Sequence, residues 1–156
     1  MHIGFKASDA DSNLFTLHHD FFVVYLLLYV DDIIITRNST SFIAYIVSRL
    51  GVAFDLKGLG PLKYFLSLQI EYTSQGLFVH QSKYTSDLLT KFNMVDCKPC
   101  LIPCSPTVHV SSQVSPLLLD PIVYRSMVGA LQYLTFTRSD LSYSVQQICQ
   151  FMSQPT

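Results

Sequence analysis

Charged side chains are scarce in this 156-residue chain. Asp, Glu, Lys and Arg make up 13% of it, about half of the usual share, and Glu71 is the only glutamate. Surface helices laced with pairs of opposite charge are therefore largely excluded. The net charge is −1 and Lys and Arg form no run, so composition gives no independent sign of nucleic-acid binding.

Long hydrophobic segments are also missing. The longest apolar run, residues 21–30, ends at Asp31 after ten residues, and a bilayer span needs about 20. The first nine residues contain neither a signal-peptide core nor an Arg-rich amphipathic pattern. We therefore expect an intracellular protein without membrane contact, in a compartment that the sequence does not identify.

Hydrophobic residues are abundant, at 49% of the chain, and the mean hydropathy is +0.33. The length suits one domain or a piece of one. We expect such an apolar chain to have more apolar surface than its own fold covers, which points to a missing partner or missing flanking chain.

Three of the four cysteines, Cys97, Cys100 and Cys104, lie close together and are followed by His109. Such a cluster could hold a structural zinc ion, and Cys97 and Cys100 form a C-x-x-C pair of the kind used in redox chemistry. A redox pair normally lies between a strand and a helix, whereas this segment is rich in proline. Free thiols are the expected state, with zinc and redox chemistry as alternatives.

The most informative stretch is residues 21–36, where Asp31 and Asp32 interrupt an apolar run. An ionised carboxylate in apolar surroundings is costly unless it is paired, hydrogen-bonded or bound to a metal. The pair is therefore expected at an exposed turn. The flanks are rich in Val, Ile, Leu, Phe and Tyr, which predicts strands at about 21–30 and 33–37 with Asp-Asp at the hairpin tip.

Two carboxylates fixed at a hairpin tip offer the hard oxygen ligands that Mg²⁺ prefers. Two such ions, about 3.5–4 Å apart, can activate the attacking oxygen and stabilise the leaving oxygen in phosphoryl transfer. The alternative is a merely structural turn, because Asp-Asp is a common turn dipeptide.

Alternating and helical patterns organise the rest of the chain. The segment 94–121 contains five prolines and many serines and is expected to be a linker. The other predicted elements, in order, are a strand at about 14–18, a helix of about twelve residues that ends near Gly51, a short strand within 52–61, a hairpin of 62–73 with 77–80, and helices at 82–92, 124–136 and 141–152.

Six blocks stand in a fixed order along the sequence: residues 4–15, 28–33 (LYVDDI), 59–66 (LGPLKYFL), 94–99 (MVDCKP), 124–134 (YRSMVGALQYL) and 137–143, which begins TRSD. Together they make the sequence similar to the C-terminal half of a copia-type retrotransposon reverse transcriptase. The chain also resembles short plant mitochondrial open reading frames derived from such elements.

The resemblance implies an α+β class and a partial right-hand polymerase fold without fingers. Residues 1–80 would form a truncated palm with two β-hairpins, and residues 81–156 thumb- or connection-like helices with the linker. Asp31 and Asp32 would be the catalytic, Mg²⁺-binding carboxylates. Tyr29 would point back toward the primer end or the incoming dNTP.

The second hairpin would correspond to the primer grip, with Phe65, Leu66 and Ser67 near its start. Lys83, on the following helix, would meet phosphates of an RNA or DNA primer-template, although an ordinary solvated lysine is the alternative. Ser67 stands where the family usually has Gly.

The family's third catalytic aspartate lies far upstream of the Tyr-Val-Asp-Asp box, and only thirty residues precede Asp31 here. We therefore expect a polymerase fragment that is inactive alone. Two alternatives stay open: half of an enzyme completed by a separate fingers and palm portion, and a domesticated nucleic-acid-binding remnant without chemistry.

Overall fold

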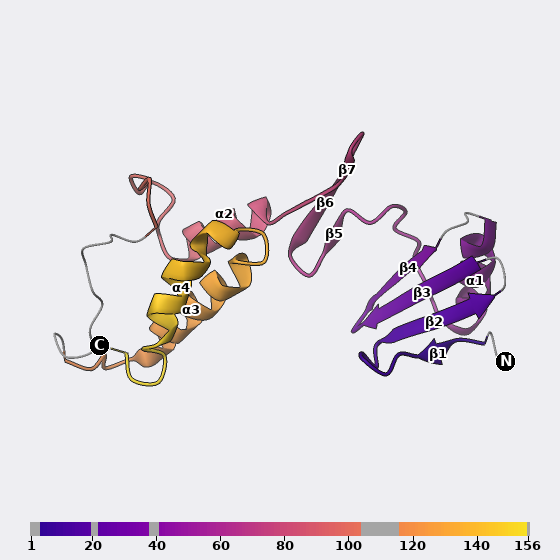
Figure 1. The fold of residues 1–156 in the computed structure, drawn as a ribbon, viewed down its shortest axis with the longest axis horizontal. Coiled ribbons are helices and arrows are strands. Elements are labelled where there is room, and N and C mark those ends of the chain that lie inside the picture. The colour runs from indigo at the N-terminus through magenta and orange to yellow at the C-terminus, as the bar shows by residue number, and fades with distance from the viewer. Residues whose placement is uncertain (1–3, 20–21, 38–40, 104–115, 156) are drawn as a thin grey trace. The chain divides into compact units, whose positions relative to one another are not determined.

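The computed structural model describes residues 4–19, 22–37, 41–103 and 116–155, and its helices and antiparallel sheets confirm the α+β class (Figure 1). Two compact units divide the chain, Met1–Leu62 and Lys63–Thr156. The second hairpin thus shares a unit with the helices that follow it. The division into palm and thumb at residues 80 and 81 concerns function and stays a prediction.

The first unit is a four-stranded antiparallel sheet with a helix packed against it. The strands pair in chain order, and the helix contacts the edge strand β4. The expected first hairpin is confirmed as β3 and β4. The elements are β1 (Lys6–Ala7), β2 (Leu14–His19), β3 (Phe22–Tyr29), β4 (Asp32–Arg37) and α1 (Ser41–Ala53).

Alternation along β3 creates the core of this unit. Val24 and Leu26 are buried, whereas Tyr25, between them, is exposed. Ile46 of α1 is also fully buried, because its helix places an apolar stripe on the sheet. The apolar side chains on one face of β3 and on one side of α1 therefore form one small core.

The helix of about twelve residues that was expected to end near Gly51 is confirmed as α1, which has 13 residues and ends at Ala53. The short strand expected within 52–61 was wrong, because residues 52 and 53 belong to α1 and residues 54–61 contain neither helix nor strand. Their Gly and Pro residues favour loop conformations over strand pairing.

Arg37 ends β4 on the buried face, directly opposite Val24. Within the described residues, its three guanidinium nitrogens have neither solvent contact nor a hydrogen-bond acceptor. Burial accordingly lowers the pKa of Arg37.

The second unit joins a three-stranded antiparallel sheet to a cluster of helices. Val128, Leu134 and Val145 are buried among the helices, and Asp120 caps α3 by accepting a hydrogen bond from the Ile122 amide at 2.9 Å. The elements are β5 (Tyr64–Phe65), β6 (Leu68–Thr73), β7 (Gly76–His80), α2 (Ser82–Lys91), α3 (Pro121–Leu134), the 3₁₀ turn η1 (Ser139–Leu141) and α4 (Ser142–Cys149).

The long strand expected at 62–73 was wrong, because a tight turn at Leu66 and Ser67 divides it into β5 and β6. Both turn residues have positive φ, at 47° and 63°. The sequence has no glycine at this turn, so the alternating pattern of residues 62–73 predicts a single strand.

The described parts of the linker, 94–103 and 116–120, contain no helix or strand. Cys97 and Cys100 are exposed free thiols there. The other proposed zinc ligands, Cys104 and His109, lie outside the described residues. Among the described helices, none has the length and apolar character needed to cross a membrane.

Replacing Ser67 with Gly should stabilise the chain by about 1 kcal/mol, because glycine adopts positive φ without the clash of a side chain. Urea unfolding measures the difference. Ser74→Gly is the matched control, since Ser74 lies in the β6–β7 turn without positive φ. It should destabilise, and a Ser67→Gly variant that loses as much stability would contradict the prediction.

Candidate catalytic and nucleic-acid-binding sites

The tip of the first hairpin carries the two predicted carboxylates. Val30 and Asp31 form the two-residue turn, and Asp32 begins β4 opposite Tyr29. The tip is thus one residue earlier than the predicted Asp-Asp pair. Tyr29, Asp31 and Asp32 are exposed, as an ionised pair in an apolar hairpin requires.

Register places Tyr29 and Asp32 on one face of the sheet, because directly opposite residues point the same way. Tyr25, four residues before Tyr29 on β3, shares that face. The exposed carboxylate of Asp32 therefore lies beside an aromatic side chain, while the buried Val24 and Leu26 occupy the other face.

Val30 has a φ of 51° and is 81% exposed. Positive φ is unusual for a β-branched residue and costs of order 1–3 kcal/mol. The tight turn imposes this conformation, and Asp31 is the second of its two residues.

The tip carries two side chains whose oxygens could bind a cation. Carboxylate oxygens are suitable ligands for Mg²⁺, and both aspartates reach solvent. Among the described residues, no group of three or more His, Cys, Asp or Glu side chains gathers closely enough to hold a metal ion. The chemistry of Asp31 and Asp32 suits Mg²⁺, but two carboxylates alone do not complete a site, so their role as metal ligands stays a prediction.

The second unit contains the other predicted site residues. Phe65 is partly buried, and Leu66 and Ser67 form the turn that follows it. The Tyr133 hydroxyl of α3 donates a hydrogen bond to the Leu66 carbonyl oxygen.

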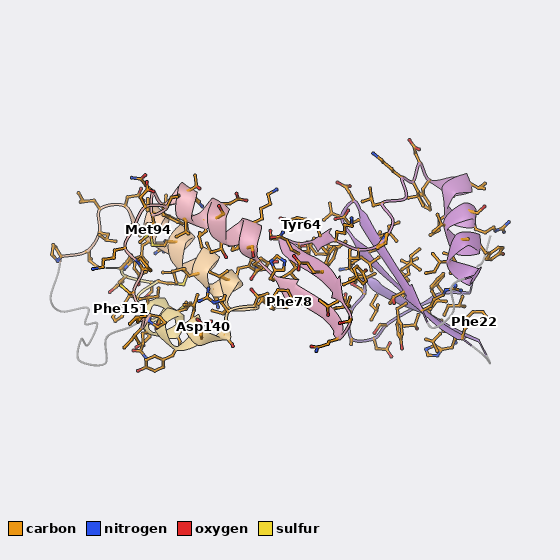
Figure 2. All side chains as sticks on the ribbon, turned by 90° about the horizontal axis from the view of Figure 1, so that it is seen from above. Phe22, Tyr64, Phe78, Met94, Asp140 and Phe151 are labelled. Atoms are coloured by element: carbon orange, nitrogen blue, oxygen red, sulfur yellow. The ribbon has the colours of Figure 1, made fainter. Side chains whose placement is uncertain are left out.

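Lys83 is fixed at the start of α2 by two contacts. Its amide donates to Gln69 Oε1 at 2.7 Å, and its ammonium group lies 5.7 Å from the centre of the Tyr64 ring. Tyr64 is 49% exposed on the small sheet, where Figure 2 labels it. Sequence reasoning missed Tyr64 and Gln69, although the exposed aromatic residue beside a lysine matches a pattern of nucleic-acid surfaces.

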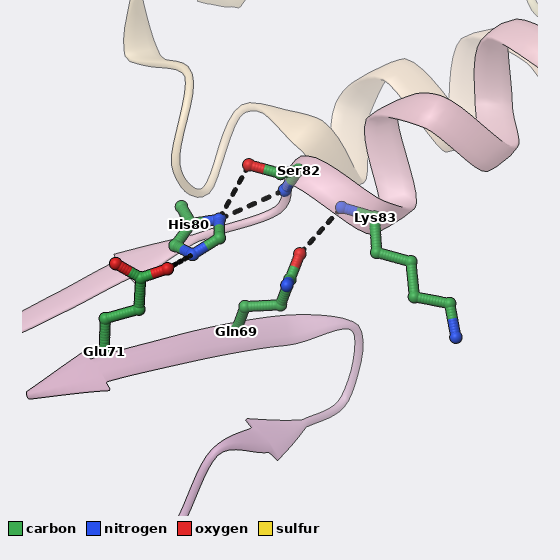
Figure 3. A network of polar contacts seen from close by, with 5 residues as sticks. All are labelled: Gln69, Glu71, His80, Ser82 and Lys83. Atoms are coloured by element: carbon green, nitrogen blue, oxygen red, sulfur yellow. Dashed lines mark hydrogen bonds and ion pairs between the residues drawn. The ribbon is translucent and has the colours of Figure 1, made fainter.

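A polar network fixes the junction between β7 and α2 (Figure 3). The Ser82 amide and hydroxyl approach His80 Nδ1 at 3.3 and 2.8 Å, and His80 Nε2 lies 3.2 Å from Glu71 Oε1. Because Nδ1 accepts from the amide, Nε2 carries the proton and donates to Glu71. Phe78 stacks on the His80 ring with 5.3 Å between centroids.

Local surroundings shift the pKa values of several side chains in this unit. Burial, and then the neighbouring Tyr133, raise the pKa of Tyr84. The side-chain hydrogen bonds between Arg138 and Asp140, at 2.9 and 2.7 Å, raise the pKa of Arg138 and lower that of Asp140. This bidentate pair is half-exposed and lies at the turn before α4.

The chain belongs to the reverse transcriptase (RNA-dependent DNA polymerase) family, whose sequence model matches residues 1–106. Its relatives include the retrovirus-related Pol polyprotein from transposon RE2 of Arabidopsis thaliana, which is 40% identical over 154 residues and covers 99% of this chain. An uncharacterized mitochondrial protein of the same plant is 46% identical over 134 residues, or 85% of this chain. The expected copia-type membership is thus confirmed.

A Pol polyprotein from a Nicotiana tabacum transposon is 33% identical over 141 residues, or 85% of this chain. The chain spans 11% of the RE2 and tobacco polyproteins and 55% of the mitochondrial relative. No solved structure matches the chain.

Replacing Gln69 with Ala should destabilise the chain by about 1 kcal/mol, because the Lys83 amide in the first turn of α2 loses its acceptor. Urea unfolding and hydrogen exchange of that amide measure the effect. Gln75→Ala, in the exposed β6–β7 turn, is the control and should change neither. Equal stability of the two variants would show that Gln69 does not hold the helix start.

Proposed function

We propose that this chain is the palm and thumb part of an RNA-directed DNA polymerase that uses two-metal nucleotidyl transfer. The observation that carries the proposal is the exposed Asp31 and Asp32 pair at a hairpin tip, in a chain of the reverse transcriptase family. In the partial right-hand fold, residues 1–80 act as palm and residues 81–156 as thumb or connection.

Asp31 and Asp32 would hold Mg²⁺ through their exposed carboxylate oxygens. The bound metal supplies activation of the primer hydroxyl and stabilisation of charge on the leaving oxygen. Tyr29 shares the sheet face with Asp32 and offers an aromatic surface to the primer end or the incoming dNTP.

Primer-template binding is assigned to the second unit. The Leu66–Ser67 turn presents backbone groups to the primer, next to Phe65. Lys83 neutralises a backbone phosphate, and its placement over Tyr64 fixes where that charge lies. These contacts would track the nucleic-acid backbone and stacked bases without reading a particular sequence.

A polypeptide of these 156 residues would not complete the reaction alone. Two catalytic metal ions require more ligands than the two carboxylates at this tip, and the described residues gather no third one. We therefore propose an inactive fragment that becomes competent when another polypeptide segment supplies the remaining palm carboxylate and the fingers. A binding role without chemistry is the second candidate, supported by the exposed Tyr64 beside Lys83.

The purified chain should extend no DNA primer on an RNA template with Mg²⁺ or Mn²⁺. A chimera that places residues 1–156 in the matching segment of an active reverse transcriptase of this family should extend it. Asp31→Asn in the chimera should lower extension at least about a hundredfold, equivalent to about 2.7 kcal/mol of activation free energy.

Asp55→Asn is the control for the loss of one exposed carboxylate and should leave extension unchanged, since Asp55 lies in the loop after α1. If the chain alone extends the primer, and Asp31→Asn abolishes this extension, the inactive-fragment proposal is contradicted. An active chimera that tolerates Asp31→Asn would exclude the catalytic role of the hairpin tip.

A further inference from the structure

The turn that connects β5 to β6 is strained. Leu66 and Ser67 both adopt positive φ, and each such residue other than glycine costs about 1–2 kcal/mol. β5 has only two residues, paired as Tyr64 with Gln69 and Phe65 with Leu68. Such a short ladder gives the turn little support of its own, so another part of the unit must stabilise it.

Helix α3 supplies that support. The Tyr133 hydroxyl donates to the Leu66 carbonyl, which joins two segments 67 residues apart in the sequence. The carbonyl belongs to a residue with positive φ, so the hydrogen bond acts at the strained position itself.

The Tyr133 ring is itself held in place. It makes edge-to-face contacts with Tyr84 and Phe136, with centroids 5.4 and 5.5 Å apart. Tyr84 is fixed in turn, because its hydroxyl donates to the Ala130 carbonyl of α3 at 3.1 Å. Tyr133 therefore reaches the turn from a preorganised aromatic cluster of Tyr84, Tyr133 and Phe136.

This cluster extends beyond the part of the chain that the family model matches. The model ends at residue 106, whereas the similarity to the RE2 polyprotein covers 99% of the chain. Helix α3 follows the matched part, but it contacts the turn within it.

We propose that Tyr133 is a positioning residue that holds the Leu66–Ser67 turn in the conformation that binds the primer strand. The inference rests on the proposed function of this turn. It makes α3 part of the primer-binding unit, although this helix touches no nucleic acid in the proposal. The hydroxyl acts by fixing the backbone whose groups meet the primer.

Tyr133→Phe in the full chain tests this inference, with Tyr124→Phe as the matched control. Each variant removes a hydroxyl of α3 that donates to a backbone carbonyl, and the Tyr124 hydroxyl donates to the Ile148 carbonyl of α4, at 2.7 Å, rather than to the turn. Fluorescence anisotropy with a labelled DNA primer on an RNA template gives the Kd. Hydrogen exchange of the Ile70 amide, which donates to the Lys63 carbonyl at 2.9 Å beside the turn, gives the order of the β5–β6 reversal.

Tyr133→Phe should raise the Kd about fivefold and speed exchange of the Ile70 amide, because one hydrogen bond to the turn is lost. Tyr124→Phe should lower the melting temperature but keep the Kd within about twofold of the original. Adding Ser67→Gly to Tyr133→Phe should recover most of the lost affinity, since glycine needs no external support at positive φ.

Equal Kd and equal Ile70 exchange in the two tyrosine variants would overturn the inference. If the original chain binds no primer-template, the proposed binding function fails. The exchange measurement then decides the positioning role alone: faster exchange only in Tyr133→Phe supports it, and unchanged exchange overturns it.

Discussion

Two adjacent carboxylates in an apolar ribbon impose the main constraint on the first unit. Ionised Asp31 and Asp32 must reach water, so the chain reverses where they lie. The strands on either side must then pair so that Val24 and Leu26 enter the core with Ile46. A slip by one residue would exchange the two faces, burying Tyr29 and Asp32 and exposing the core. Core packing and the position of the carboxylates therefore depend on the same register.

The second unit depends on contacts between residues that are distant in the sequence. Its three-stranded sheet is small, and the Leu66–Ser67 turn and the junction between β7 and α2 both need support from distant residues. Tyr133 supports the turn, while Gln69 and the His80–Glu71 contact order the start of α2. The residues assigned to primer binding thus lie on a surface fixed by side chains that touch no primer in this proposal.

Local pattern predicted much of the fold. The apolar run around Asp31 predicted the first hairpin, and helical spacing predicted α2 closely, at 82–92 against Ser82–Lys91. Predictions from the sequence pattern were wrong where residues other than glycine adopt positive φ. Leu66 and Ser67 form a tight turn of this kind, and no glycine there indicates it. The pattern also failed at Val30, a β-branched residue at positive φ, so the tip was placed one residue late.

Contacts between residues that are distant in the sequence could not be predicted from local sequence patterns. The Tyr133–Leu66 hydrogen bond and the Lys83–Tyr64 contact depend on how the helices pack on the small sheet, which no local period encodes. Family resemblance correctly identified the class of protein, because its motifs are contiguous in sequence. The assignment of Asp31 and Asp32 as metal ligands stays a proposal, supported by their exposure and by oxygen chemistry.

Manganese relaxation tests the central claim most directly. Mn²⁺ is titrated into the isotopically labelled chain, and paramagnetic broadening of each backbone amide is followed by NMR. The account predicts the strongest broadening at residues 30–33, lost when Asp31 and Asp32 are both replaced by Asn. Broadening spread evenly over the chain, or unchanged in the double variant, would contradict a cation site at the hairpin tip.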